Sequence, residues 1–287
     1  MMNNGSTTSY TKIDLAFLVL VLGVILGVYF PVLTKLINDW GINDNYSHGF
    51  FVPFISAYMI FSIREKIKEK QISPANWGLL ILLGGFAQLY LASVGSELFL
   101  QRTSLIIVLL GYCLFLLGVR ITWVVMLPLV YLIFMVPLPA IIWNKIAFPL
   151  QLFSSQITEY VIRLAGIPIL REGNVLHLAS TSLEVVDACS GLRSLNTMFA
   201  LSIAFAWFST LTKLGKWLLF FAAAPIAITA NMVRLTLTAF LAAHYGEKAA
   251  QGFLHEFSGM FTFILGLLLL ILVRRFLPER KQAAQSQ

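Results

Sequence analysis

The segment Trp217–Ala243, with the sequence WLLFFAAAPIAITANMVRLTLTAFLAA, decides the fold class. It contains 27 residues and a single charged side chain, Arg234. A helix needs about 20 mostly apolar residues to cross the hydrocarbon core of a membrane. The segment is long enough for this, so we interpret it as a membrane-spanning helix of an integral membrane protein.

The composition supports this interpretation. Of the 287 residues, 59% are hydrophobic and 11% are charged, whereas soluble domains carry roughly 45–50% apolar and about 25% charged residues. The mean hydropathy is +0.84. These values exclude a soluble enzyme, a nucleic-acid-binding domain and a disordered chain. The net charge of +7 is therefore not the footprint of a nucleic acid, and we expect no nucleic-acid partner.

Seven further apolar segments resemble membrane spans. We predict an all-α polytopic membrane protein with about eight transmembrane helices, and a single membrane domain over residues 1–287. The other predicted spans are Leu15–Leu33, Gly49–Ile63, Trp77–Val94, Thr103–Val119, Ile121–Val136, Ser194–Ser209 and Glu256–Val273.

The basic residues predict the orientation. With an even number of spans, both termini lie on one side, and the segments on that side hold 12 of the 20 Lys and Arg residues. Basic residues are enriched in cytoplasmic loops, so we expect both termini in the cytoplasm. The twelve residues are Lys12, Arg64, Lys66, Lys68, Lys70, Arg120, Lys213, Lys216, Arg274, Arg275, Arg280 and Lys281.

The long segment between the fifth and sixth predicted spans lies on the outer side in this topology. Within it, Asn144–Leu164 has apolar residues at helical spacing, which suits a helix lying on the membrane surface. Glu172–Val186 alternates and is rich in Val and Leu, as in a short hairpin. We expect the helix and the hairpin to form a small outer cap over the bundle.

Cys189 is the first candidate for chemistry. It lies in VDACSGLRSL, where the predicted hairpin leads into the sixth span. The amino end of the following helix and Arg193 would lower the pKa of this thiol and favour the reactive thiolate. An inert, buried cysteine is the alternative.

Two further residues share the predicted outer edge with Cys189. Arg234 lies within a span, where a basic residue by default indicates function, and Asn231 shares its helix face. The alternative is that Arg234 extends to the membrane interface. His255 opens the last span; HEFSG lacks the second histidine of a zinc HExxH motif, so we expect no metal and no cofactor. A thiol, a base and a cation on one face are typical of covalent acyl transfer.

At these residues the chain resembles the exosortase/archaeosortase family of membrane-embedded cysteine transpeptidases. The resemblance covers most of the chain and is specific because several motifs occur together. These motifs are Ala188–Ser194 around Cys189, Asn231–Arg234, Gly252–His255 followed by Gly259, Tyr46–Phe50 with Pro53, Phe134–Pro139, and Arg171–Asn174.

The resemblance implies an activity and a substrate class. Exosortases act on exported proteins that end in a sorting signal, namely a short motif that is often Pro-Glu-Pro-like, a transmembrane helix and a basic tail. By resemblance, Cys189 would form a thioester, His255 would act as acid and base, and Arg234 would stabilise the oxyanion. Arg193 would bind an acidic motif residue, and His48 is a candidate for lining the site.

The family also implies a location and partners. The expected location is the bacterial inner membrane, with the active site on the periplasmic side, among membrane lipids. A glycan or lipid is the expected acceptor of the cleaved protein.

Three other functions remain open on the sequence alone. A transporter or channel would use Arg234 and His255 along a conduction path, although the predicted spans lack acidic residues and detectable repeats. A non-catalytic scaffold for polysaccharide export would leave Cys189 inert. A serine intramembrane protease would use Ser190, which lacks the expected Gly-x-Ser-Gly setting.

Overall fold

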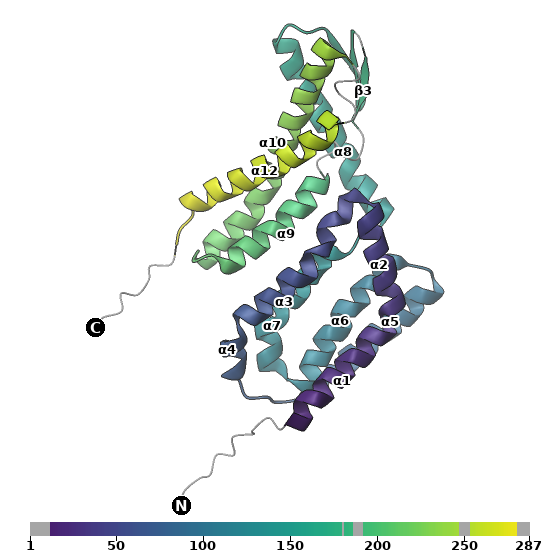
Figure 1. Cartoon of the computed structure of the whole chain (residues 1–287), viewed down its shortest axis with the longest axis vertical. Coiled ribbons are helices and arrows are strands. Elements are labelled where there is room, and N and C mark those ends of the chain that lie inside the picture. The colour runs from purple at the N-terminus through teal and green to yellow at the C-terminus, as the bar shows by residue number, and fades with distance from the viewer. Residues whose placement is uncertain (1–11, 180, 186–191, 247–252, 280–287) are drawn as a thin grey trace, which may run out of the picture. The chain divides into compact units, whose positions relative to one another are not determined.

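The structure is a computed structural model that describes residues 12–179, 181–185, 192–246 and 253–279 (Figure 1). The chain divides into two compact units, each treated by itself below. Unit 1 comprises Met1–Phe50 and Ser56–Val136, and unit 2 comprises Phe51–Ile55 and Pro137–Gln287.

The described residues of unit 1 form helices joined by short loops. Helices α5 and α6 lie side by side (Figure 1) and correspond to the third and fourth predicted spans. The elements are α1 (Lys12–Val28), α2 (Phe30–Ile42), the 3-10 helix η1 (Asp44–Phe50), α3 (Val52–Ser62, shared between the units), α4 (Arg64–Lys68), α5 (Gly78–Val94), α6 (Leu98–Leu116), α7 (Val119–Tyr131) and the 3-10 helix η2 (Leu132–Met135).

Glycines allow the close approach of α5 and α6. A Cβ atom added to Gly111 would lie 2.5 Å from the backbone nitrogen of Leu82, and one added to Gly78 would lie 2.5 Å from that of Phe115. Small residues let helix backbones pack closely in membrane proteins. The contact between these two helices therefore depends on backbone atoms as well as on side chains.

The first predicted span, Leu15–Leu33, is not one straight helix. The chain bends by 64° between α1 and α2, and Pro31 lies in the first turn of α2, where proline is tolerated because its missing N–H would have no intrahelical partner. At the bend the buried hydroxyl of Tyr29 lies 2.8 Å from the hydroxyl of Ser104 on α6.

Unit 2 combines four long helices with a small sheet. Strands β1, β2 and β3 form an antiparallel sheet in that order. The predicted hairpin is present as β2 and β3, and β1 adds a third strand that the sequence pattern did not reveal. The elements are α8 (Ala140–Leu164), β1 (Ile169–Glu172), β2 (Val175–Leu178), β3 (Ser182–Glu184), α9 (Leu192–Phe208), α10 (Lys213–Tyr245) and α12 (Phe253–Phe276).

One face of the sheet packs against the carboxyl end of α10. Its buried side chains Leu176 and Val185 belong to one hydrophobic cluster with Leu235 and Ala239 of α10 and Ile162 of α8. Full burial of a Val, Leu or Ile side chain away from water stabilises a fold by about 1.5–3 kcal/mol. The sheet therefore packs against α10 at Leu235, the residue that follows Arg234.

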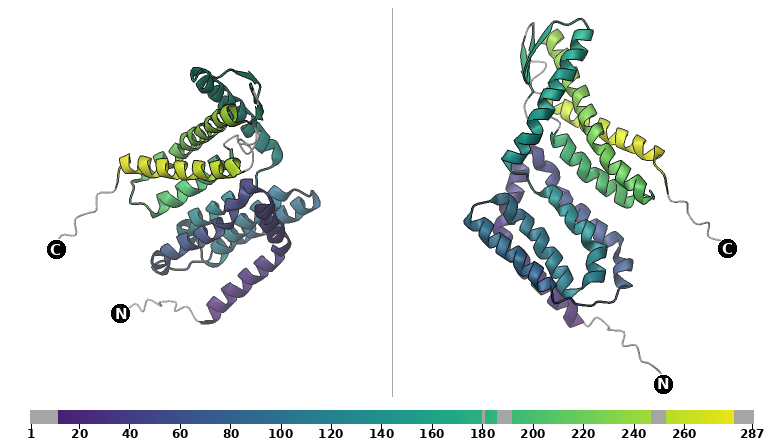
Figure 2. Two further views of the ribbon diagram at one scale, coloured as in Figure 1. Left: turned by 45° about the horizontal axis from the view of Figure 1, so that its top comes forward. Right: turned by 180° about the vertical axis from the view of Figure 1, so that it is seen from behind.

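Helices α9, α10 and α12 pack against one another (Figure 2). The fully buried Met198 of α9 packs against Ala223 and Ala227 of α10. A Cβ atom added to Gly266 of α12 would lie 2.5 Å from the terminal methyl of Met198. Small residues on α10 and α12 thus make room for one long side chain from α9.

The apolar helices make the protein a helical multi-pass membrane protein. Among the described residues, Leu98–Leu116, Lys213–Tyr245 and Gly259–Phe276 are long and apolar enough to cross a membrane, which gives three spans. The number rises to five if each of two bent helix pairs counts as one span. The eight spans, the outer position of the cap and the single domain stay predictions.

Candidate active site

Arg234 is buried inside unit 2. It lies in the second half of α10 and is 6% exposed. Asn231, three residues earlier, is fully buried and lies on the same face of the helix. An arginine that merely reaches the membrane interface would keep its guanidinium exposed. The burial argues for a polar site inside the helix bundle.

The first turns of α12 lie beside this guanidinium. A Cβ atom added to Gly259 would lie 3.9 Å from Nη1 of Arg234. Thr262 and Leu270 are buried, and Gly266 contacts α9, so the inward stripe of α12 runs through positions 259, 262, 266 and 270. The fold therefore places the Arg234 guanidinium beside Gly259, four residues after His255 in the sequence.

The structure describes only some of the other residues of the predicted site. Cys189 lies outside the described residues, as do the side chain of His255 and the residues 186–191. Arg193 is half-buried in the first turn of α9, a helix that packs against α10 and α12.

The sheet end that precedes Cys189 in the sequence is well anchored. The buried Val185 donates its N–H to the carbonyl oxygen of Asn174 at 2.9 Å. The side-chain amide of Asn174 in turn donates to the Val185 carbonyl oxygen at 3.3 Å. The segment with Cys189 therefore starts from a fixed strand end and leads into α9.

His48 lies in unit 1, whereas Arg193, Asn231 and Arg234 lie in unit 2. Its Nε2 atom is 3.1 Å from the carbonyl oxygen of Phe134. Burial lowers the pKa of the His48 imidazole from its usual 6.5, and the hydrogen bond to Phe134 opposes this shift. Because the lowered pKa favours the neutral ring, His48 joins η1 to η2 as an uncharged group.

Two polar features of the structure were missed by the sequence analysis. The first is an ion pair between Arg102, which is 4% exposed, and Asp39 of α2. Arg102 lies one residue before the predicted span Thr103–Val119, but α6 begins at Leu98 and includes it. The bend before α2 brings Asp39 to it, and nothing in the local sequence predicts that approach.

The second is a polar stripe on α8. Gln151, Ser154, Ser155 and Thr158 are buried, and the hydroxyl of Thr158 lies 3.4 Å from that of Thr236 on α10. The signal was present in the sequence, because these four residues recur at helical spacing on one face. The stripe turns toward the protein rather than toward lipid.

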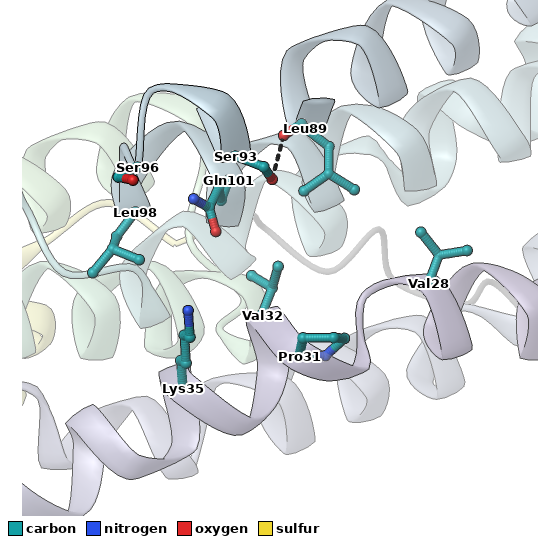
Figure 3. Close-up of a pocket in the computed structure, with 9 residues that line it drawn as sticks. All are labelled: Val28, Pro31, Val32, Lys35, Leu89, Ser93, Ser96, Leu98 and Gln101. Atoms are coloured by element: carbon teal, nitrogen blue, oxygen red, sulfur yellow. Dashed lines mark hydrogen bonds between the residues drawn. The ribbon is translucent and has the colours of Figure 1, made fainter. Parts of the chain in front are cut away.

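A cavity of about 310 Å³ lies in unit 1 between α2 and the α5–α6 connection (Figure 3). Lys35 and Gln101 point into it from opposite sides, and apolar side chains such as Val32 and Leu89 complete its lining. None of the predicted site residues is among the described residues that line it. Likewise, no group of three or more His, Cys, Asp or Glu residues in the described part of the chain could hold a metal ion.

Comparison with known proteins adds the family. The family model described as transmembrane exosortase matches residues 40–272, from the end of α2 into α12. No curated protein and no solved structure matches the chain. The family match covers most of the chain and includes the buried arginine and the helix turn beside it. The chain therefore belongs to the transmembrane exosortase family.

Proposed function

We propose that this chain is a membrane cysteine transpeptidase or protease that processes exported proteins carrying a C-terminal sorting signal. The observation that carries the proposal is the buried Arg234, whose guanidinium lies beside Gly259 of α12, in a member of the exosortase family. A buried cation of this kind suits the stabilisation of a developing oxyanion.

The chemistry uses groups of this chain alone. The Cys189 thiolate attacks the scissile carbonyl carbon, and a C–S bond forms as the carbonyl electrons move to oxygen. Arg234, held on one face with Asn231, stabilises this oxyanion. The C–N bond then breaks, and the departing amine takes a proton from His255. An acceptor nucleophile then gives a proton to His255 and attacks the thioester, and the C–S bond breaks to release the thiolate and complete the transfer.

Further parts of the proposal concern recognition and location. Arg193 binds an acidic residue of the sorting motif, since a guanidinium grips a carboxylate with two hydrogen bonds. We assign no role in the reaction to His48. The chain crosses the bacterial inner membrane about eight times with both termini in the cytoplasm, and the site faces the periplasm. Membrane lipids surround it, and the acceptor is a glycan or a lipid.

The test compares the two cysteines of the chain. Processing of an exported reporter that ends in a Pro-Glu-Pro motif, an apolar helix and a basic tail is followed in cells for Cys189→Ala and Cys113→Ala. Cys113 lies on α6 in unit 1 and serves as the matched control. We expect Cys189→Ala to abolish processing with an unchanged amount of protein in the membrane, and Cys113→Ala to retain it.

The alternative functions give different results. A scaffold or transporter would keep its phenotype in Cys189→Ala, and substantial reporter cleavage by this variant would contradict a cysteine enzyme. Cys189→Ser should also be nearly inactive, because a hydroxyl is a far weaker nucleophile without strong base activation.

A further inference from the structure

Strand β3 forms an open edge of the small sheet. Within the described part of the chain the sheet has the order β1-β2-β3, and no fourth strand pairs with the outer side of β3. An unpaired strand edge presents a row of N–H and C=O groups to any extended chain that approaches it. The edge is therefore a candidate surface for a peptide.

The pairing pattern identifies the groups that point outward. The N–H of Leu178 donates to the Thr181 carbonyl oxygen at 2.8 Å, and the N–H of Val185 donates to that of Asn174 at 2.9 Å. Hydrogen-bonded pairs alternate along an antiparallel ladder, so Leu183 bonds inward to Leu176 in the same register. The N–H and C=O groups of Ser182 and Glu184 consequently point away from β2.

The two edges of the sheet differ in their surroundings. Helix α8 contacts β1 and β2, and its Glu159 forms an ion pair with Arg171 of β1 at 3.1 Å. On β3, Ser182 and Glu184 are exposed, while Leu183 between them packs against the hydrophobic cluster on α10. The inner face of β3 is thus held by the core, and its edge stays accessible.

The position of β3 in the chain indicates the occupant. Glu184 precedes the proposed nucleophile Cys189 by five residues, and Val185 belongs to the same cluster as Leu235, the neighbour of Arg234. A peptide paired with β3 advances along it at about 3.3 Å per residue. It therefore lies on the sheet that packs against α10 at Leu235, next to Arg234.

We propose that β3 binds the substrate by strand addition: the extended segment beside the scissile bond pairs with the outward backbone groups of Ser182 and Glu184. The inference rests on the proposed function and specifies how that function selects its substrate. Main-chain hydrogen bonds supply the affinity in this mode of recognition, and alternate side chains supply the specificity.

This mode fits a segment in which prolines alternate with another residue. Prolines two positions apart place both missing N–H groups on the same side of a strand. The residue between them then turns its own N–H and C=O toward β3. Proline also restricts the residue before it to an extended conformation, so such a segment loses less conformational freedom on binding. A peptide of this kind can pair through one edge only.

The first experiment separates the backbone of β3 from its side chains. Glu184→Pro removes an outward N–H, and an edge strand tolerates proline where the N–H faces away from the ladder. Glu184→Ala removes the carboxylate and keeps the N–H. We expect reporter processing in Glu184→Pro to be at least tenfold lower than in Glu184→Ala, because only the proline removes the backbone donor. Equal processing by both variants would overturn the proposal.

The second experiment measures binding without catalysis. In a chain carrying Cys189→Ala and Cys113→Ala, a cysteine is introduced by Glu184→Cys, and single cysteines are moved along the reporter beside its motif. Directly opposite residues on paired strands have Cβ atoms about 4.5–5.5 Å apart. We therefore expect a disulfide cross-link at the reporter position opposite residue 184 and none at its two immediate neighbours, whose side chains point to the other face. Glu172→Cys, on the opposite edge strand, is the matched control and should give none.

The outcomes distinguish this proposal from the proposed function. Absent cross-links, or equal cross-links at adjacent reporter positions, overturn strand addition even if processing still depends on Cys189. A cross-link confined to one position and missing at its neighbours supports strand addition even if Cys189→Ala remains active in processing, a result that would contradict the cysteine mechanism instead.

Discussion

Gly259 provides a graded test of whether the position of the Arg234 guanidinium matters. A Cβ atom at Gly259 would lie 3.9 Å from Nη1, which is an ordinary van der Waals contact. Gly259→Ala should therefore keep processing within about threefold of the wild type, while alanine also favours the helix by roughly 1 kcal/mol.

Gly259→Leu should behave differently. Two further bonds of about 1.5 Å each carry the leucine methyl groups into the space of the guanidinium, and a helical leucine points toward the preceding turn, which holds His255. Arg234 or that turn must then shift by on the order of 1–2 Å. A misplacement of about 1 Å can cost about 100-fold in rate, so we expect at least that loss.

The assay is reporter processing in cells, normalised to the enzyme extracted from membranes. Gly84→Leu on α5 is the matched control, because a Cβ atom added there meets nothing within 4 Å, and it should process normally. Normal processing by Gly259→Leu would refute the reasoning, since a displaced guanidinium would then have no effect. Equal losses in the alanine and leucine variants would refute the steric explanation.

Three further predictions concern the arginine, the topology and unit 1. Arg234→Lys keeps the charge but loses the planar pair of donors; processing should fall by about 10²–10³-fold with unchanged membrane insertion, and normal processing would return Arg234 to the interface. In outer-membrane-permeabilised cells, a membrane-impermeant thiol reagent should label a cysteine introduced at Ser180 and leave one introduced at Ser73 unlabelled. Labelling of both from outside would contradict the orientation. Because the pKa of His48 is lowered from 6.5 in the folded chain, the unfolded chain binds more protons as the pH falls through that value, and stability should fall as the pH drops below about 6.5. Thermal unfolding in detergent should show this fall, and His48→Gln should reduce it; an unchanged fall would exclude His48 as its source.

The sequence predicted the helices well where one apolar run makes one helix. The run Trp217–Ala243 lies within α10, and Trp77–Val94 matches α5 within one residue. Hydropathy shows that a run of residues is apolar but not where its helix axis bends. The bend at Tyr29 was therefore not predictable from the run that contains it. Strand β1 was missed because four residues, Ile169–Glu172, give too short an alternation to recognise.

In the candidate site, too, features within one helix were predictable from the sequence, and contacts between helices were not. Asn231 and Arg234 were predictable because a polar pair stands out in an apolar helix. That Gly259 lies beside Arg234 was not, since it depends on how α12 crosses α10. The ion pair of Asp39 and Arg102 likewise depends on the approach of two helices far apart in sequence.

The central claim is that Cys189 carries the substrate as a thioester, and the most direct measurement is mass spectrometry of the enzyme isolated during processing. Purified with a reporter whose transfer has been slowed, the wild-type chain should carry the reporter fragment on Cys189. Hydroxylamine should release the adduct, as it does a thioester, and Cys189→Ala should carry none. Active processing with no adduct on Cys189, or an adduct that persists in Cys189→Ala, would contradict the account.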